Sequence, residues 1–395
     1  MSNCIILPGL RISQPIGDLY VAKIKAKDLL NISYSDVRSI ADETYRNTYL
    51  GIQRKLDHKR EQEIAEYVQT FDATFPTSII VYIDENNVEI TENSISGVSQ
   101  IKILNVSDKI AKVIDGQHRL AGLQAAIDYL EKNNSDLFNS HEKELQNIKD
   151  FELSLTILIG MDIAEQANIF SKVNLTQTKV NKSLVYDLEE YSKVRSPYKS
   201  AHNIAIALNY NETSPFYKKI KRLGYIDLGG ETLTQQTFVE SLTKLFLSSN
   251  PEKDRDDMAR KGNISNDDFD EKFPFRKLFA DDKDIIIAKI LYNYFNAVKN
   301  KWPDAWGNSY YLLSKNNGFR ALMRYLKDIY IKLYSDDSVV IPSTDDFSKY
   351  FTDFEIKSEE FTPKSFKLGE SGMNEFYKYL KGELSYQDLM LNKKS

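Results

Sequence analysis

The chain of 395 residues lacks cysteine pairs, a long apolar run and an excess of positive charge. Its only cysteine, Cys4, excludes an internal disulfide framework, a cysteine-built zinc site and most thiol-redox mechanisms. No apolar stretch approaches the roughly 18–20 residues that span a bilayer. The first residues also lack the basic and apolar segments of a signal peptide. We therefore expect a cytoplasmic protein with no membrane partner.

The charge balance excludes a polycation that coats nucleic acid, because the chain has 52 basic and 57 acidic residues and a net charge of −5. Any contact with nucleic acid must come from a local basic surface. Hydrophobic residues make up 42% and charged residues 28% of the chain, which is typical of folded soluble proteins. The length is enough for two domains.

Periodicity divides the chain near residue 175. Before this point, four β-rich runs alternate with amphipathic helices, and the last run alternates apolar and polar positions as a strand with one buried face does. The runs are residues 19–24, 78–83, 110–114 and 151–159. Helices are expected from Asp57 to Phe71, from Gly116 to about Leu130, and after Asp162, which can cap a helix through Phe170. In the first of these, one face carries Ile64, Tyr67, Val68 and Phe71.

The second half is almost entirely helical in pattern. Thr232 and Gln235 resemble a capping box ahead of an apolar helix, and residues 285–298 and 319–333 are further amphipathic stretches. Residues 250–272 are crowded with charged and amide side chains and predict a solvated loop. We expect an α/β domain over residues 1–180, followed by an α-helical domain over residues 181–395.

The most informative segment is Asp115-Gly116-Gln117-His118-Arg119, where a short apolar strand runs into a glycine and a helix starts at once. Such a junction leaves backbone N–H groups at the positive end of the helix dipole, which favours an anion, most often a phosphate. Gly116 allows close approach or a positive φ, and Arg119 can donate two parallel hydrogen bonds to a phosphate.

Gln117 and His118 add further donors beside this predicted phosphate site. Asp115 can hold Mg²⁺, orient a water or cap the helix. A purely structural interpretation stays open, in which Asp115 is only a cap and Arg119 only forms a surface ion pair.

This string, followed by Leu120-Ala121-Gly122, resembles the signature of the DGQHR-domain family, which includes the DndB proteins associated with DNA phosphorothioation. Residues 51–60, leading into 64–67 and 75–79, resemble the upstream block of that family, and residues 170–180 resemble its downstream block. The family is distantly similar to the ParB and sulfiredoxin fold, in which a Gly-x-x-Arg at a strand–helix junction holds the phosphates of CTP or ATP. The resemblance implies this ParB/sulfiredoxin-like fold for residues 1–180, with Gly116 to Arg119 at the phosphates. Sulfiredoxin has its catalytic cysteine where this chain has Gln117, so sulfinic-acid repair is not expected.

Other polar clusters extend the candidate site. Gln53, Arg54 and Arg60 lie in a basic block, and Asn174, Thr176 and Gln177 follow a predicted helix. Under the resemblance, both groups line the nucleotide site; the alternatives are a solvated charged face for the first and helix caps for the second. In the second half, Lys218, Lys219, Lys221 and Arg222 form a basic run beside Tyr217, which either contacts DNA or is ordinary surface.

The resulting expectation is a nucleotide-binding and nucleotide-hydrolysing protein of a DNA-modification or defence system, using ATP or another NTP with Mg²⁺. In it, Asp115, Gln117, His118 and Arg119 are the catalytic candidates, and Asp115 holds the metal. The alternatives are a DndB-like DNA-binding transcriptional regulator without catalysis, and a scaffold with a vestigial site. Expected partners are a nucleotide and DNA, with DNA-modification enzymes and a second copy of the chain as further candidates.

Overall fold

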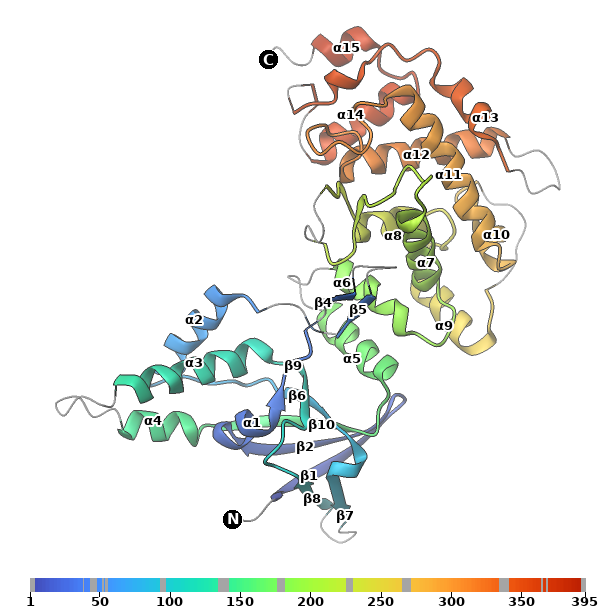
Figure 1. Cartoon of the computed structure of the whole chain (residues 1–395). Coiled ribbons are helices and arrows are strands. Elements are labelled where there is room, and N and C mark those ends of the chain that lie inside the picture. Colours follow the sequence, from blue (N-terminus) through green and yellow to red (C-terminus); the bar gives the residue numbers. More distant parts are fainter. Residues whose placement is uncertain are drawn as a thin grey trace. The chain divides into compact units, whose positions relative to one another are not determined.

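The computed structural model places two compact units, residues 1–177 and residues 178–395 (Figure 1). The structure describes residues 4–37, 39–42, 48–51, 53, 56–92, 97–133, 142–175, 182–224, 230–264, 271–333, 341–363, 365–366 and 369–391. The first unit mixes strands and helices, and the second is mostly helical, as the periodicity of the sequence predicts. Each unit is described by itself.

An eight-stranded mixed sheet forms the framework of the first unit, with strand order β3-β9-β6-β10-β2-β1-β8-β7. β10 pairs with β6, and β3 with β9, in parallel; the other neighbours are antiparallel. These strands are β1 (Cys4–Gln14), β2 (Gly17–Lys25), β3 (Ser33–Tyr34), β6 (Ile79–Ile83), β7 (Val88–Thr91), β8 (Val98–Leu104), β9 (Ala111–Asp115) and β10 (Glu152–Ile159). A separate pair consists of β4 (Ser39–Asp42) and β5 (Thr48–Leu50). The four predicted strands are β2, β6, β9 and β10.

The helices of this unit are α1 (Ala26–Ile32), α2 (His58–Tyr67), the short 3₁₀ helix η1 (Glu85–Asn87), α3 (Gln117–Asn133), α4 (Glu142–Lys149) and α5 (Ile163–Leu175). Leu123 and Leu130 of α3 are buried in one core with Val81 of the sheet. α2 has no buried residue and packs on α3 through the partly buried Ile64 and Ala65 (Figure 1).

Two details of this unit test the predicted helix ends. Asp162 caps α5, because its Oδ1 accepts hydrogen bonds from the N–H groups of Ala164 at 2.8 Å and Glu165 at 3.0 Å. The prediction that the helix beginning at Asp57 continues to Phe71 is wrong. α2 ends at Tyr67, the Thr70 N–H turns back to the Tyr67 carbonyl, and Phe71 is fully exposed.

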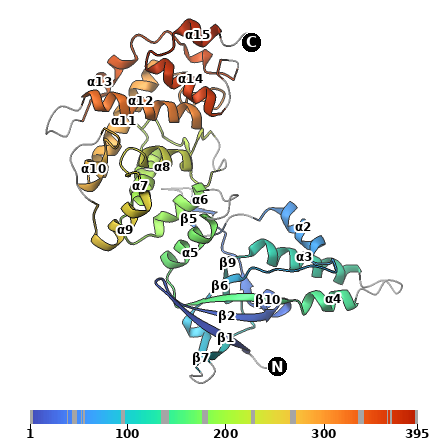
Figure 2. The same cartoon turned by 180° about the vertical axis from the view of Figure 1, so that it is seen from behind.

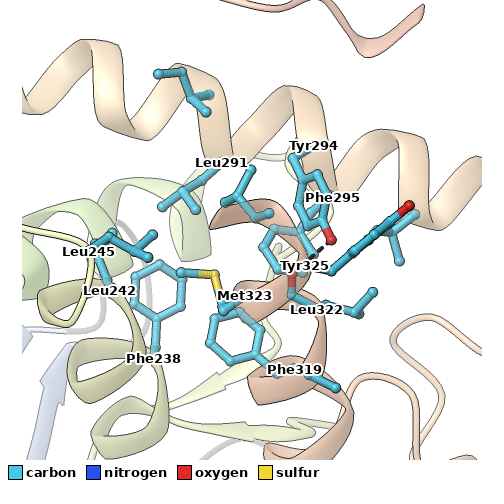
Figure 3. Close-up of a cluster of buried hydrophobic side chains, with 14 of the residues drawn as sticks. Phe238, Leu242, Leu245, Leu291, Tyr294, Phe295, Phe319, Leu322, Met323 and Tyr325 are labelled. Carbon is cyan, nitrogen blue, oxygen red and sulfur yellow. Dashed lines mark hydrogen bonds between the residues drawn. The ribbon is translucent and has the colours of Figure 1, made fainter. Parts of the chain in front are cut away.

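The helical unit surrounds a large aromatic core. Its elements are α6 (Lys182–Asp187), η2 (Leu188–Tyr191), α7 (Pro197–Tyr210), β11 (Ile220–Lys221), β12 (Leu233–Thr234), α8 (Gln235–Thr243), α9 (Pro251–Lys261), α10 (Arg276–Ala280), α11 (Asp284–Lys301), α12 (Asn316–Leu333), α13 (Thr344–Ser348), η3 (Lys349–Phe351), η4 (Ser358–Glu360), α14 (Glu370–Leu380) and α15 (Tyr386–Leu391). Phe319 of α12 stacks on Phe238 of α8 and Phe295 of α11, with ring centroids 5.5 and 5.3 Å apart (Figure 3). Seen from behind, α11 and α12 lie next to each other (Figure 2).

The structure corrects two expectations for this half. Residues 250–272 are not one loop, because residues 251–261 form α9, whose buried Met258 belongs to the core. Asn250 caps this helix and Asp254 pairs with Arg276 at 2.9 Å, so the charged side chains serve local structure rather than solvation alone. The cap of α8 is Thr234, whose hydroxyl oxygen accepts from the Thr237 N–H, and not Thr232. Within the described residues, every helix is too short or too polar to cross a membrane.

Candidate functional site

Gly116 connects β9 to α3 in a conformation that only glycine adopts readily. Its φ is +100°, in the region that L side chains rarely occupy. A Cβ at this position would lie 2.5 Å from Cδ1 of Ile79 and 3.1 Å from Nη2 of Arg119. The sequence predicts a close approach to the backbone at Gly116, and the atoms that make this approach belong to β6 and α3 of the protein itself.

Arg119 donates hydrogen bonds from both terminal nitrogens to the segment before β6. Nη1 donates to the Thr77 carbonyl at 2.5 Å and to its hydroxyl at 2.9 Å. Nη2 donates to the Ser78 carbonyl at 3.0 Å and to Oδ2 of Asp115 at 3.2 Å. Because each of these nitrogens carries two hydrogens, all four are used within the chain. Arg119 therefore joins the start of α3 to the start of β6 and the end of β9.

The environment of Arg119 is partly desolvated, with 16% of its side chain exposed. Burial lowers the pKa of the guanidinium, the Asp115 charge raises it, and the nearby positive charge of Arg60 lowers it further. An arginine nevertheless remains protonated in proteins. The charge of Arg119 is thus compensated mainly by Asp115 and by carbonyl dipoles.

His118 is buried and holds the start of α2. Its Nε2 accepts a hydrogen bond from the backbone N–H of Asp57 at 3.1 Å, which requires the neutral ring with its hydrogen on Nδ1. Asp57 in turn caps α2 by accepting from the Lys59 N–H at 3.0 Å. His118 therefore connects the first turns of two helices, a contact between residues that are 61 positions apart.

Three further residues of the family signature and its upstream block also lie inside the unit. Gln53 is fully buried, and its Nε2 donates to the Val113 carbonyl of β9. Gly122 lies where α2 crosses α3: a Cβ there would be 2.4 Å from Cγ2 of Ile64. Gln117 begins α3 and is buried. These residues pack or hydrogen-bond within the unit and position its elements.

Arg60 is the exception at this junction. It is exposed in the first turn of α2 and forms no hydrogen bond or ion pair with the residues that the structure describes. Arg54, Thr176 and Gln177 lie outside the described residues, and of Asn174 only the backbone, at the end of α5, is described. Within the described part of this junction, Arg60 is therefore a cation that is available to an external anion.

Few of the described side chains at this junction could serve as metal ligands. Asp115 is the candidate ligand for Mg²⁺, and its Oδ2 accepts from Arg119. Among the described residues, no group of three or more His, Cys, Asp or Glu side chains could hold a metal ion. A magnesium ion here would depend largely on oxygen atoms of a bound phosphate, as is common for this ion.

The basic run of the helical unit divides into exposed and buried members. Lys218 is exposed with a φ of +52°, and its Nζ lies 5.2 Å from the ring centroid of Tyr217. Lys219 and Lys221 are half-buried. The grouping of Arg222 with this surface is wrong, because Arg222 is 3% exposed and pairs with the fully buried Asp187 at 2.7 Å.

Electrostatic interactions explain why Arg222 can be buried. Burial alone would lower the pKa of Arg222, but the charge and hydrogen bond of Asp187 outweigh it and hold the pKa above the usual value. Arg222 is therefore a structural cation.

The family model for DndB, described as DNA-sulfur modification-associated, matches residues 7–211, more than half of the chain. The chain belongs to the DndB family. No curated protein and no solved structure matches it significantly. The match covers the sheet unit from Leu7 and reaches the end of α7, so the strand–helix junction lies inside it. Residues 212–395, with Lys218 and most of the helical core, lie beyond it.

This membership associates the chain with DNA-sulfur modification. The ParB/sulfiredoxin-like assignment of the sheet unit stays a prediction. Sequence reasoning identified the junction but not the partners Thr77, Ser78 and Asp57, which lie in loops about 40–60 positions away. It also missed a row of basic residues on α12, Arg320, Arg324 and Lys327, although their spacing of four and three residues places them on one helix face.

Proposed function

We propose that the chain is a DNA-binding regulatory component of DNA-sulfur modification, without catalysis of its own. The observation that carries this proposal is the set of Lys218, Lys219 and Lys221, whose ammonium groups have no ion-pair partner among the described residues. Phosphate contacts by such lysines position a protein on DNA without reading its sequence. The association of the DndB family with DNA modification supports DNA as the polyanion.

Salt dependence of DNA affinity tests this proposal. Fluorescence anisotropy with a labelled duplex would be measured from low to physiological salt, with the wild-type chain and with Lys218, Lys219 and Lys221 changed to Gln. Each lost phosphate contact lowers the slope of log K against log[salt] by about 0.9, so the triple variant should lose roughly two to three units.

The matched control changes three other exposed lysines of the helical unit, Lys299, Lys332 and Lys378, to Gln. It keeps the same net charge as the triple variant. DNA affinity that ignores salt, or equal slopes for both variants, would contradict the proposal.

A second candidate function is nucleotide binding at the strand–helix junction, with ATP or another NTP as the ligand. It is favoured by Arg60, which has no partner among the described residues and is near enough to Arg119 to lower the pKa of that guanidinium. In this proposal, Arg60 and the N–H groups at the start of α3 contact the phosphates, while Arg119 only positions the loop before β6. Hydrolysis would further require Asp115 to hold Mg²⁺ or orient a water.

Thermal stabilisation by ATP, CTP and GTP, each with and without Mg²⁺, tests this second function. A ligand at a hundredfold excess over Kd stabilises the folded state by about 2.7 kcal/mol. Arg60→Gln should abolish the shift, whereas Lys143→Gln, an exposed lysine of α4, should keep it. A shift that persists in Arg60→Gln would exclude the junction as the site. If the shift is lost in that variant, measuring phosphate release with Mg²⁺ separates hydrolysis from binding.

A further inference from the structure

The helical unit contains a cavity of about 550 Å³, here named the phenylalanine cavity. Phe361, Phe366 and Phe376 line it together with Thr232, Lys315 and Asn317. Its volume lies within the range of about 300–1,000 Å³ that small-molecule sites occupy. The walls thus combine aromatic rings with a few polar groups.

Those polar groups are available to a ligand. The hydroxyl of Thr232 is buried, and no hydrogen-bond partner for it occurs in the described part of the chain. A buried hydroxyl without a partner is unfavourable, so a ligand atom that pairs with it would be stabilised. The side chains of Lys315 and Asn317 likewise form no hydrogen bond or ion pair with described residues.

A second cavity of about 430 Å³ carries an excess of positive charge and is named the cation cavity. Its lining includes Lys244, the residue that ends α8 as its C-cap, and Arg320, Arg324 and Lys327 of α12, against one carboxylate, Glu370. Its apolar lining includes the buried Leu245 and Met323, which lie among the core side chains of Figure 3. Positive charges that converge without matching carboxylates attract an anion.

Two of these cations have no partner in the part of the chain that the structure describes. Arg324 donates to Oδ1 of Asn374 at 2.7 Å, and Lys327 donates to the Lys272 carbonyl at 2.9 Å. Lys244 and Arg320 form no such bond. The cation cavity therefore offers Lys244 and Arg320 as basic donors that no described residue occupies.

The two cavities adjoin along α12. Asn316, Asn317 and Gly318 in its first turn line the phenylalanine cavity, and the next two turns, from Arg320 to Lys327, line the cation cavity. Met373 of α14 lines both. A ligand with a flat ring at one end and an anionic group at the other matches this arrangement.

We propose that the two cavities form one binding site for a nucleoside phosphate, with the base in the phenylalanine cavity and the phosphates in the cation cavity. Polar groups such as Thr232 and Asn317 inside an aromatic pocket suit a heterocycle better than an alkyl chain, because ring nitrogens and carbonyls can pair with them. Arginine and lysine are the usual phosphate ligands. The ligand is either a free nucleotide or the end of a single strand.

Binding measurements on the full chain test the site with three probes: ATP, tripolyphosphate and a 5′-phosphorylated oligothymidylate. Arg320→Gln should raise the Kd of ATP at least tenfold, and Thr232→Val should raise it severalfold. Lys332→Gln is the matched control, because Lys332 is an exposed lysine of α12 outside both cavities; it should leave the Kd within twofold. Tighter binding of the oligonucleotide than of ATP, with the difference lost in Arg320→Gln, would identify the strand end as the source, and the reverse order would identify the free nucleotide.

Several outcomes would overturn the site. An Arg320→Gln chain that binds ATP and oligonucleotide as tightly as wild type would exclude the cation cavity. If tripolyphosphate binds as tightly as ATP and Thr232→Val has no effect, the phenylalanine cavity does not hold the base. Loss of ATP binding in Arg60→Gln but not in Arg320→Gln would assign nucleotide binding to the strand–helix junction. Absence of saturable binding of ATP and of the oligonucleotide would also refute the proposal.

Discussion

The strand–helix junction and the two cavities of the helical unit use cations in opposite ways. At the junction, Arg119 donates both hydrogens of each terminal nitrogen to Thr77, Ser78 and Asp115. Along α12, Arg320 lines a cavity and has no partner among the described residues. A chemically suggestive motif can thus serve the fold, while an unremarkable helix presents the groups that are free to bind.

The largest effect is expected where a buried cation is removed from the helical unit. Arg222→Gln removes the cation that pairs with the fully buried Asp187 and should lower the free energy of unfolding by about 4 kcal/mol. Arg320→Gln should change it by less than about 0.5 kcal/mol. Both tryptophans, Trp302 and Trp306, lie in this unit and are buried, so their fluorescence during urea unfolding reports on it. Equal losses for the two variants would break the distinction between structural and free cations.

Gly116→Ala should destabilise the sheet unit by about 3 kcal/mol, because it adds strain at a positive φ to an overpacked contact with Ile79. Gly262→Ala is the control: its φ is +74°, but a Cβ there meets no atom within 4 Å. It should cost only about 1 kcal/mol. Hydrogen exchange of peptides from each unit, followed by mass spectrometry, measures both changes. Similar costs would mean that the approach to Ile79 is not restrictive.

Arg119→Gln should lower the stability of the sheet unit by about 2 kcal/mol, since four hydrogen bonds and the ion pair with Asp115 are lost. Arg60→Gln removes an exposed charge that pairs with none of the residues the structure describes, so it should be nearly neutral. Faster exchange in the peptides that contain Thr77 and Ser78 is expected only in the Arg119 variant. A neutral Arg119→Gln would make this arginine available for the phosphate role that the sequence suggests.

Thr232→Val should have the smallest effect and the opposite sign. Replacing a buried, unpartnered hydroxyl by a methyl group of similar size should raise the stability of the helical unit by about 1 kcal/mol. Thr243→Val is an informative comparison, because the Thr243 hydroxyl donates to the Val239 carbonyl at 2.9 Å. That change should be neutral or destabilising in the tryptophan-monitored urea titration. Destabilisation by Thr232→Val would show that its hydroxyl has a partner.

The extent to which the fold follows from sequence differs between elements. Alternation of apolar residues is a local property, so β10 and the helices α11 and α12 could be predicted from it. The end of α2 could not, because Phe71 continues the apolar spacing but meets no packing partner and stays exposed. α9 was missed because its sequence is almost entirely polar, and the single buried Met258 gives no apolar periodicity. Its Asp254 pairs with Arg276, which lies 22 positions away and therefore gives no local signal.

The sequence alone determined that an α/β region precedes a helical region, and it located the glycine that connects β9 to α3. Only the tertiary structure decided which cations are neutralised. Lys218 and Arg222 lie four positions apart in one basic run, yet the first is exposed and the second pairs with the buried Asp187. The physical reason is that a charge can leave water only where another segment supplies a counter-charge and hydrogen bonds. That supply depends on contacts between residues distant in the chain.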